Sequence, residues 1–305
     1  MDMRAIISQM AVLFALLALG YLGCKLKALT AETGRILTKV VFTLGLPATI
    51  LHSATGGNLR IEGRSTAVFF LLAIAAYAIY LIISYPVGRL LSADKKQRGL
   101  YTFMMIFGNI GFMGLPVVTS IFGPGAAFYA AMFNVPFWMT SVFFADSLIA
   151  GKKVRFNLKF LLDPLIIASI LVIPLTISGI SLPFVVTEVI RLTGNITTPA
   201  SMIVIGVTLA QSPISGVFVN RKLYPIAFVK LIIIPVAVWL LFRGFVSNEL
   251  TLGVIVILSA MPTGAIAAMF AIEHRSDEAT ASAGVFLTTL LSGITIPLIV
   301  YFLLF

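Results

Sequence analysis

The chain has 305 residues, of which 60% are hydrophobic and only 10% are charged, and its mean hydropathy is +1.09. A soluble domain is about 45–50% apolar and about 25% charged, so this composition excludes a soluble globular protein and predicts a polytopic membrane protein. The formal net charge is +10, but the basic residues stand in short loops between apolar stretches, which argues against nucleic acid binding. The single cysteine, Cys24, excludes a disulfide framework and a cysteine-rich metal site.

Ten stretches are long and apolar enough to be membrane-spanning helices, each of which needs about 20 residues. The first is span-length rather than the short core of a signal peptide, so we expect it to be retained. The second and seventh contain Pro47 and Pro199, which predict a bend or a break. The spans are predicted at 5–24, 33–53, 66–91, 99–122, 125–149, 164–181, 184–212, 222–245, 248–272 and 277–304.

Basic residues are divided unequally between the two sides of this arrangement. Sixteen of the 21 Lys and Arg residues lie in or beside the loops that follow odd-numbered spans. Cytoplasmic loops carry the excess of Lys and Arg. We therefore expect these loops to be cytoplasmic and both termini to lie on the extracytoplasmic side.

A basic loop near the middle divides the spans five and five. Because five is odd, a second half with the fold of the first would enter the membrane upside down, as in transporters built from inverted repeats. We expect a first five-helix repeat at 1–150, a short cytoplasmic linker at 151–163 and a second, inverted five-helix repeat at 164–305.

The fourth span contains GNIGFMGLP (108–116), whose three glycines, asparagine and proline are poor helix formers. A break here frees backbone groups that cost several kcal/mol each in hydrocarbon, so the segment must be buried in protein or line a watery cavity. The segment AMPTGA (260–265) in the ninth span is its counterpart. Paired interrupted spans indicate the binding site of a secondary transporter, although glycine and proline are also common in membrane helices.

Polar groups near these breaks suit an anionic ligand. The side chains of Asn109, Asn134 and Thr263 can form hydrogen bonds, and freed amides at half-helix N-termini attract negative charge. For Asn134 a hydrogen bond between helices is an equal alternative. The predicted substrate-binding residues are Asn109, Gly111, Gly114, Pro116, Asn134, Met261, Pro262, Thr263 and Gly264.

Charges inside spans are scarce, so each is a candidate functional group. Lys230 lies about two turns inside the eighth span, and we expect its side chain to extend to the interface. Asp146 and Glu273 lie near cytoplasmic helix ends, where pairing with nearby basic residues is the simpler explanation. All three are candidates for coupling or for attracting an anion.

Motifs of enzyme chemistry are absent from the sequence: it contains no GxSxG, HExxH or P-loop pattern. We therefore expect no enzyme activity, no cofactor and no metal site.

Three segments resemble the auxin efflux carrier family, which includes bacterial malate and malonate permeases and plant auxin exporters. They are GNIGFMGLPVVTSIFG in the fourth span and SAMPTGAIAAMFAIEH followed by DEATASAGVFLTTLLSGITIPLIVYFL in the ninth and tenth. The resemblance implies the fold of sodium–bile acid symporters, with the broken fourth and ninth helices crossing at Asn109–Pro116 and Met261–Gly264. It also implies a transport bundle from spans 3–5 and 8–10, a scaffold from spans 1, 2, 6 and 7, and a homodimer. Gly108 replaces a proline of the plant motif, which argues against auxin as the substrate.

Together these features predict an elevator-type secondary transporter of small organic anions such as malate or malonate. Coupling to protons or exchange without coupling is expected rather than coupling to Na⁺, because no carboxylate stands beside the crossing in the sequence. A sodium-coupled symporter of the bile acid type and a channel or uniporter are the alternatives.

Overall fold

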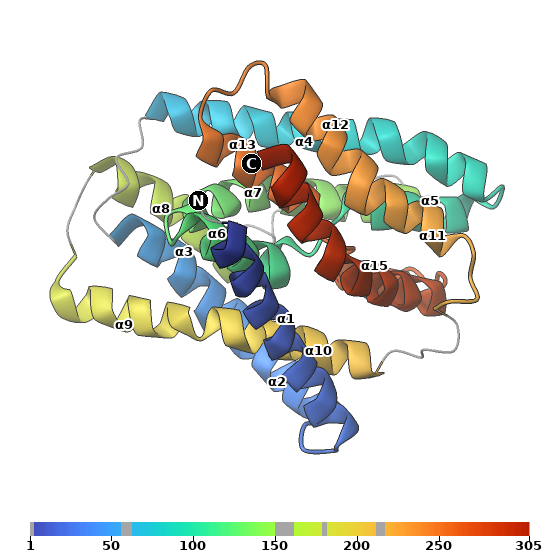
Figure 1. Cartoon of the computed structure of the whole chain (residues 1–305), viewed down its shortest axis with the longest axis horizontal. Coiled ribbons are helices and arrows are strands. Elements are labelled where there is room, and N and C mark those ends of the chain that lie inside the picture. Colours follow the sequence, from blue (N-terminus) through green and yellow to red (C-terminus); the bar gives the residue numbers. More distant parts are fainter. Residues whose placement is uncertain (1–2, 56–62, 150–161, 179–181, 212–216, 305) are drawn as a thin grey trace. The chain divides into compact units, whose positions relative to one another are not determined.

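The computed structural model describes residues 3–55, 63–149, 162–178, 182–211 and 217–304, so most of the predicted linker at 151–163 lies outside it. Within these ranges every named element is helical (Figure 1). The α-helices are α1 (Met3–Lys25), α2 (Ala31–Val40), α3 (Leu46–Thr55), α4 (Gly63–Leu91), α5 (Lys95–Ile106), α6 (Leu115–Phe122), α7 (Ala126–Phe144), α8 (Pro164–Ser178), α9 (Phe184–Asn195), α10 (Thr197–Gln211), α11 (Leu223–Phe228), α12 (Ile234–Phe242), α13 (Glu249–Ser259), α14 (Ile266–Glu273) and α15 (Glu278–Ile299). The π-helical segments are η1 (Val41–Gly45), η2 (Ile110–Gly114), η3 (Ala145–Ile149), η6 (Val229–Ile233) and η7 (Val300–Leu304).

Six helices in the described ranges are long and apolar enough to cross a membrane. They coincide with the predicted spans 1, 2, 3, 7, 8 and 10. The apolar helices at the predicted spans 4, 6 and 9 are shorter. In the fourth and ninth spans this is because the chain leaves the helix within the span. A helical polytopic membrane protein is confirmed, whereas ten spans and an inverted repeat stay predictions.

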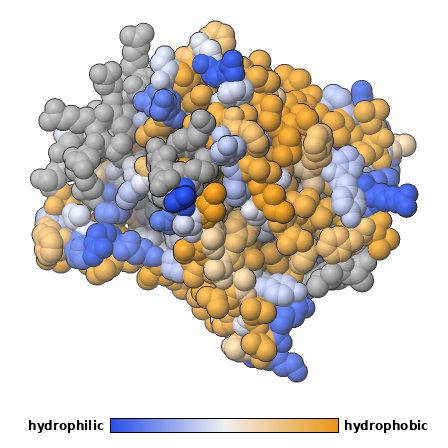
Figure 2. All heavy atoms as spheres, in the orientation of Figure 1, coloured by the Kyte–Doolittle hydropathy of each residue, from blue (hydrophilic) through white to orange (hydrophobic). Residues whose placement is uncertain are grey.

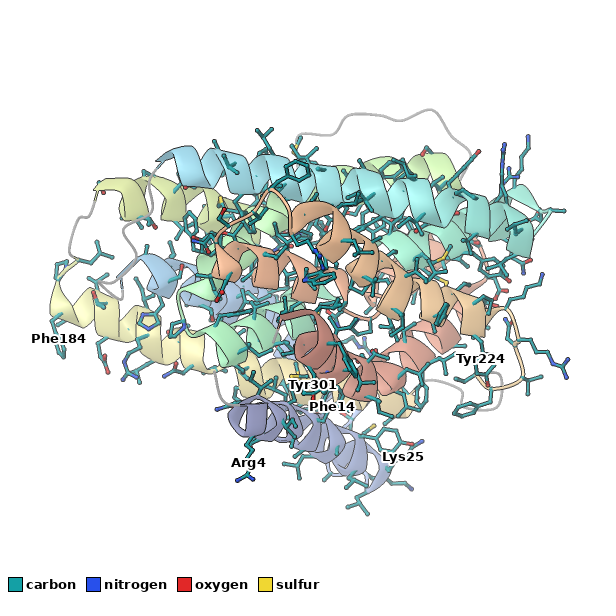
Figure 3. The ribbon with its side chains drawn as sticks, turned by 45° about the horizontal axis from the view of Figure 1, so that its top comes forward. Arg4, Phe14, Lys25, Phe184, Tyr224 and Tyr301 are labelled. Carbon is teal, nitrogen blue, oxygen red and sulfur yellow. The ribbon has the colours of Figure 1, made fainter. Side chains whose placement is uncertain are left out.

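Apolar side chains that a soluble protein would bury face outward. Figure 2 shows apolar atoms over most of the visible surface. Leu90 and Phe245 are each 87% exposed, and Phe184 at the start of α9 is 81% exposed. Figure 3 labels Arg4 and Lys25 at opposite ends of the apolar helix α1. Basic residues at both ends of such a helix reach the two interfaces of a bilayer.

The chain forms two compact units, and the first comprises Met1–Leu71, Gly111–Val135 and Leu158–Gln211. In this unit α1 packs along α10, and α3 packs against α8 and α9 (Figure 1). A methyl group added to Gly20 would overlap the carbonyl group of Ile203, and one added to Gly206 would overlap that of Leu17. The backbones of α1 and α10 therefore touch, as is common where small residues line helix interfaces in membranes.

Gly20→Ala is therefore expected to lower the stability of the purified protein by about 1–3 kcal/mol, the usual cost of overpacking. Gly244→Ala is the matched control, because a methyl group there would meet no atom within 4 Å. Thermal unfolding of both variants in detergent measures the difference. Equal melting temperatures for Gly20→Ala and the wild type would mean that α1 and α10 do not touch at this point.

The second unit comprises Leu72–Ile110, Pro136–Asn157 and Ser212–Phe305. Here α12 packs against α13, and α15 packs against α11, α14 and η6. Three helices begin at side-chain caps: Asp94 accepts a hydrogen bond from the backbone of Gln97 (2.8 Å), and Asn248 and Asp277 do the same for α13 and α15. These caps satisfy amides that helix starts leave unpaired.

Three π-helical segments each end two residues before a proline: η1 before Pro47, η2 before Pro116 and η6 before Pro235. A proline ring clashes with the carbonyl group four residues earlier and donates no hydrogen bond, and a wider turn relieves both problems. The predicted distortion near Pro47 therefore takes the form of a π-helical turn. In the seventh span, α9 and α10 are separated at Ile196, three residues before Pro199. π-Helical turns are frequent at functional sites.

Candidate functional site

The fourth and ninth spans are both interrupted where their glycine, proline and polar residues cluster. α5 ends at Ile106, and regular α-helix resumes only at Leu115. α13 ends at Ser259, and α14 begins at Ile266. The first break contains Gly108 and Asn109, and the second contains Met261–Gly264. Each break leaves backbone groups without partners from their own helix.

The two breaks pair with each other inside the second unit. The amide of Asn109 donates a hydrogen bond to the carbonyl oxygen of Pro262 at 2.7 Å. The amide of Gly264 donates to the carbonyl oxygen of Phe107 at 2.9 Å. Gly108 and Thr263 form an antiparallel bridge between these bonds. The pairing satisfies backbone groups that would otherwise be costly at membrane depth.

Thr263 connects the second break to α5 and α15 by hydrogen bonds. Its side chain is fully buried, and its hydroxyl group donates to the carbonyl oxygen of Met104 at 3.0 Å. Its own amide donates to the hydroxyl group of Thr288 on α15 at 3.1 Å. These bonds give Thr263 a structural part at the crossing, and its predicted contact with a substrate stays a prediction.

Most of the backbone N–H groups that were predicted to bind an anion already donate hydrogen bonds within the protein. Those of Asn109, Thr263 and Gly264 all donate to protein oxygens. The amides of Ala265 and Ile266, at the half-exposed start of α14, donate no backbone hydrogen bond outside their helix among the described residues. The N-terminal end of α14 therefore keeps the positive potential that favours an anion.

Asn109 is the polar side chain of the crossing that is available to a ligand. It is half-buried, and its side-chain amide group makes no hydrogen bond to the described residues. A half-buried amide without an internal partner can bind a carboxylate. Asn109 lies directly beside Pro262, because its backbone amide donates a hydrogen bond to the carbonyl oxygen of Pro262.

Lys230 extends toward the crossing and not to the membrane interface, so the expected interfacial position is wrong. Its residue is 1% exposed, and its ammonium group donates to the carbonyl oxygen of Ile106 at 3.4 Å. The same group lies 5.4 Å from the centre of the Tyr80 ring. The hydroxyl groups of Tyr80 and Ser259 are hydrogen-bonded to each other. These contacts place the Lys230 side chain beside the end of α5, and the Tyr80 ring beside the end of α13.

Four of the predicted binding residues belong to the first unit: Gly111, Gly114, Pro116 and Asn134. Gly111 faces Leu46, because a methyl group on Gly111 would lie 3.6 Å from Cδ1 of that leucine. Pro116 is buried at the start of α6, and Gly114 precedes that helix. Asn134 is 5% exposed on α7. The structure brings Asn109, Met261, Pro262, Thr263 and Gly264 together in the second unit.

The first unit contains a pocket of about 350 Å³. Hydroxyl and amide side chains line much of it, among them Thr49, Thr119 and Asn195, and His52 contributes an imidazole. The hydroxyl group of Thr49 already donates to that of Thr197 at 2.8 Å. The volume suits a small organic molecule, so this pocket is a second location at which such a ligand could bind.

The two acidic candidates lie in α14 and in η3. Glu273 is the exposed last residue of α14 and forms no ion pair with the described residues. Asp146 lies in η3, and its side chain is outside the described part of the structure. A role of either carboxylate in coupling therefore stays a prediction.

Sequence reasoning missed three residues of the crossing: Tyr80, Ser259 and Thr288. All three are polar residues inside apolar spans, and Ser259 stands directly before the AMPTGA segment. Polar side chains at membrane depth seek partners on neighbouring helices. A search for all buried hydroxyl groups, and not only those in the glycine- and proline-rich segments, would have found them.

Two interrupted apolar helices whose breaks pair with each other are typical of secondary transporters, which makes the chain a candidate membrane transporter by its construction. Sequence comparison gives the same class, because the family described as "Membrane transport protein" matches residues 5–152 and 152–300. The chain therefore belongs to this family, which is the auxin efflux carrier family that its fourth, ninth and tenth spans resemble.

Its relatives are similar along almost their whole length. An "Uncharacterized transporter" of Methanothermobacter thermautotrophicus is 26% identical over 93% of this chain and 93% of its own. A "Putative malonate transporter" of Rhizobium meliloti is 23% identical over 94% of this chain and 92% of its own. "Uncharacterized transporter YfdV" of Escherichia coli is 19% identical over 97% and 96%, respectively.

Proposed function

We propose that this membrane transporter is a secondary carrier of small organic anions, in particular carboxylates such as malonate or malate. The observation that carries the proposal is the crossing in the second unit, where two chain breaks pair and the side-chain amide of Asn109 makes no hydrogen bond to the described residues. Substrate sites of secondary transporters lie at such interrupted helices.

Charge favours an anion at this place. The amides of Ala265 and Ile266 at the start of α14 donate no backbone hydrogen bond to described residues outside their helix, and the Lys230 side chain contacts the end of α5 at the first break. Among the described side chains no carboxylate forms an ion pair with Lys230. A relative named for malonate supports the carboxylate class, since malonate is a small dianion.

The transport cycle that we propose is an elevator. A bundle from spans 3–5 and 8–10 carries the crossing against a scaffold from spans 1, 2, 6 and 7, which also forms a homodimer. The membrane is the bacterial inner membrane, with both termini on the extracytoplasmic side. Coupling is to protons, or the carrier exchanges one anion for another.

Uptake into proteoliposomes tests the proposal. We expect saturable uptake of radiolabelled malonate, malate or succinate that protein-free liposomes lack. Unlabelled carboxylates of the same length should compete. Unitary currents in a planar bilayer would instead identify a channel, and uptake that requires Na⁺ at constant pH would identify a sodium symporter. Absence of uptake for every carboxylate would contradict the substrate class.

A further inference from the structure

Lys230 is a charged residue in the apolar eighth span, and the structure gives it an uncommon position. It belongs to η6, the π-helical turn before Pro235, and its residue is 1% exposed. A lysine at membrane depth normally extends to the interface or pairs with an acid. The Lys230 side chain is buried instead of reaching an interface, and none of the described carboxylates forms an ion pair with it.

The partners of the ammonium group are backbone oxygen and an aromatic ring. It donates to the carbonyl oxygen of Ile106, the last residue of α5, at 3.4 Å. A methyl group on Gly108 would lie 3.1 Å from the Lys230 nitrogen and 3.2 Å from the carbonyl oxygen of Met261, so both atoms border the same small space. The ammonium group is therefore next to the carbonyl end of one half-helix and the unwound chain of the other.

The ring of Tyr80 completes the surroundings at 5.4 Å from the nitrogen. An aromatic face attracts a cation most strongly where water is excluded. The Tyr80 hydroxyl group is hydrogen-bonded to the hydroxyl group of Ser259, the last residue of α13. This bond holds the ring beside the end of the second interrupted helix.

Carbonyl groups of unwound chain and the C-terminal ends of half-helices are what secondary transporters use to bind a coupling cation such as Na⁺. In this chain a covalently attached ammonium group occupies such a position. A free cation at the same oxygens would be repelled by it and would lack room.

We propose that Lys230 is a resident cation of the crossing, which takes the place of a bound metal cation and holds the two chain breaks together without sodium. The cation position stands on the structure alone. Its consequence, that transport does not require Na⁺, rests on the proposed function.

Cation-dependent thermal stability of the purified protein tests the position. Wild type is expected to melt at the same temperature in NaCl, LiCl, KCl and choline chloride of equal ionic strength. Lys230→Ala opens the space and removes the charge, so it should melt several degrees lower in choline chloride. Na⁺, Li⁺ or ethylammonium should restore part of that loss. Lys222→Ala removes an exposed lysine and is the matched control, expected to behave as wild type.

Two results would overturn the proposal: stabilisation of the wild type by Na⁺ over choline, or Lys230→Ala that responds to none of the cations. Should Lys230→Ala fail to fold, Lys230→Met keeps the side-chain length without the charge. It is expected to melt below wild type in every salt, and wild-type stability for Lys230→Met would contradict a cation position. Melting is measured without substrate, so the result does not depend on whether carboxylates are transported.

Discussion

Uptake of malonate by Asn109→Ala is expected to fall by roughly 10- to 100-fold at substrate concentrations below saturation. Asn109 is half-buried at the first break, and its amide group has no partner among the described residues. A hydrogen bond to a charged group contributes about 1.5–3 kcal/mol, and about 1.4 kcal/mol corresponds to a factor of ten. Because the backbone of Asn109, and not its side chain, bonds to Pro262, the pairing of the breaks should survive the substitution.

Two variants make this result specific. Asn220→Ala removes the same side chain outside the crossing, where it contacts Thr280, and should transport as wild type does. Asn195→Ala removes an amide from the pocket of the first unit. If Asn109→Ala transports normally and Asn195→Ala does not, the substrate binds in that pocket. Equal melting temperatures and elution volumes would show that all variants are folded.

The location of the breaks could be predicted from the sequence because the local signal is strong. Gly108, Asn109 and Pro116 cannot sustain a regular helix together, and the same holds for Pro262 and Gly264. A chain in hydrocarbon must then satisfy the freed groups nearby. Pairing of the two breaks is the solution that the structure shows, with Asn109 bonded to Pro262.

The use of individual polar groups could not be predicted, because it depends on which partner lies within reach. The substrate contact expected of Thr263 stays a prediction, but its hydrogen bonds to the carbonyl oxygen of Met104 and the hydroxyl group of Thr288 could not be foreseen. Lys230 was expected at the interface because a long side chain can span two turns. The carbonyl end of α5 attracts it inward instead. None of these three partners is near in sequence to the residue it bonds.

Six of the predicted spans coincide with long apolar helices, whereas the fourth and ninth do not. The fourth and ninth spans are broken, as their glycine and proline residues predicted, and each consists of shorter helical segments separated by chain that is not helical. Length and hydropathy alone therefore identify only six long apolar helices in the described ranges. The polar and glycine-rich residues that obscure a span by composition are the same residues that form the crossing.

Gly264→Val is expected to abolish uptake and to lower the melting temperature by more than any other change at the crossing. A methyl group on Gly264 would lie 3.1 Å from the carbonyl oxygen of Gly108, and valine adds two further methyl groups on stiff bonds. The segments must then separate, which lengthens the bonds from Asn109 to Pro262 and from Gly264 to Phe107. Backbone groups left unpaired at membrane depth cost several kcal/mol each.

A graded series separates this cause from the general effect of adding volume. Gly264→Ala needs a shift of only a few tenths of an ångström and should keep part of the uptake, between wild type and Gly264→Val. Gly244→Val adds the same side chain where a methyl group would meet no atom within 4 Å, so it should leave uptake and melting temperature unchanged. Because the two hydrogen bonds lie on either side of Gly108 and Thr263, separation at Gly264 weakens both bonds together. Normal uptake by Gly264→Val would mean that transport does not require the two breaks to stay paired.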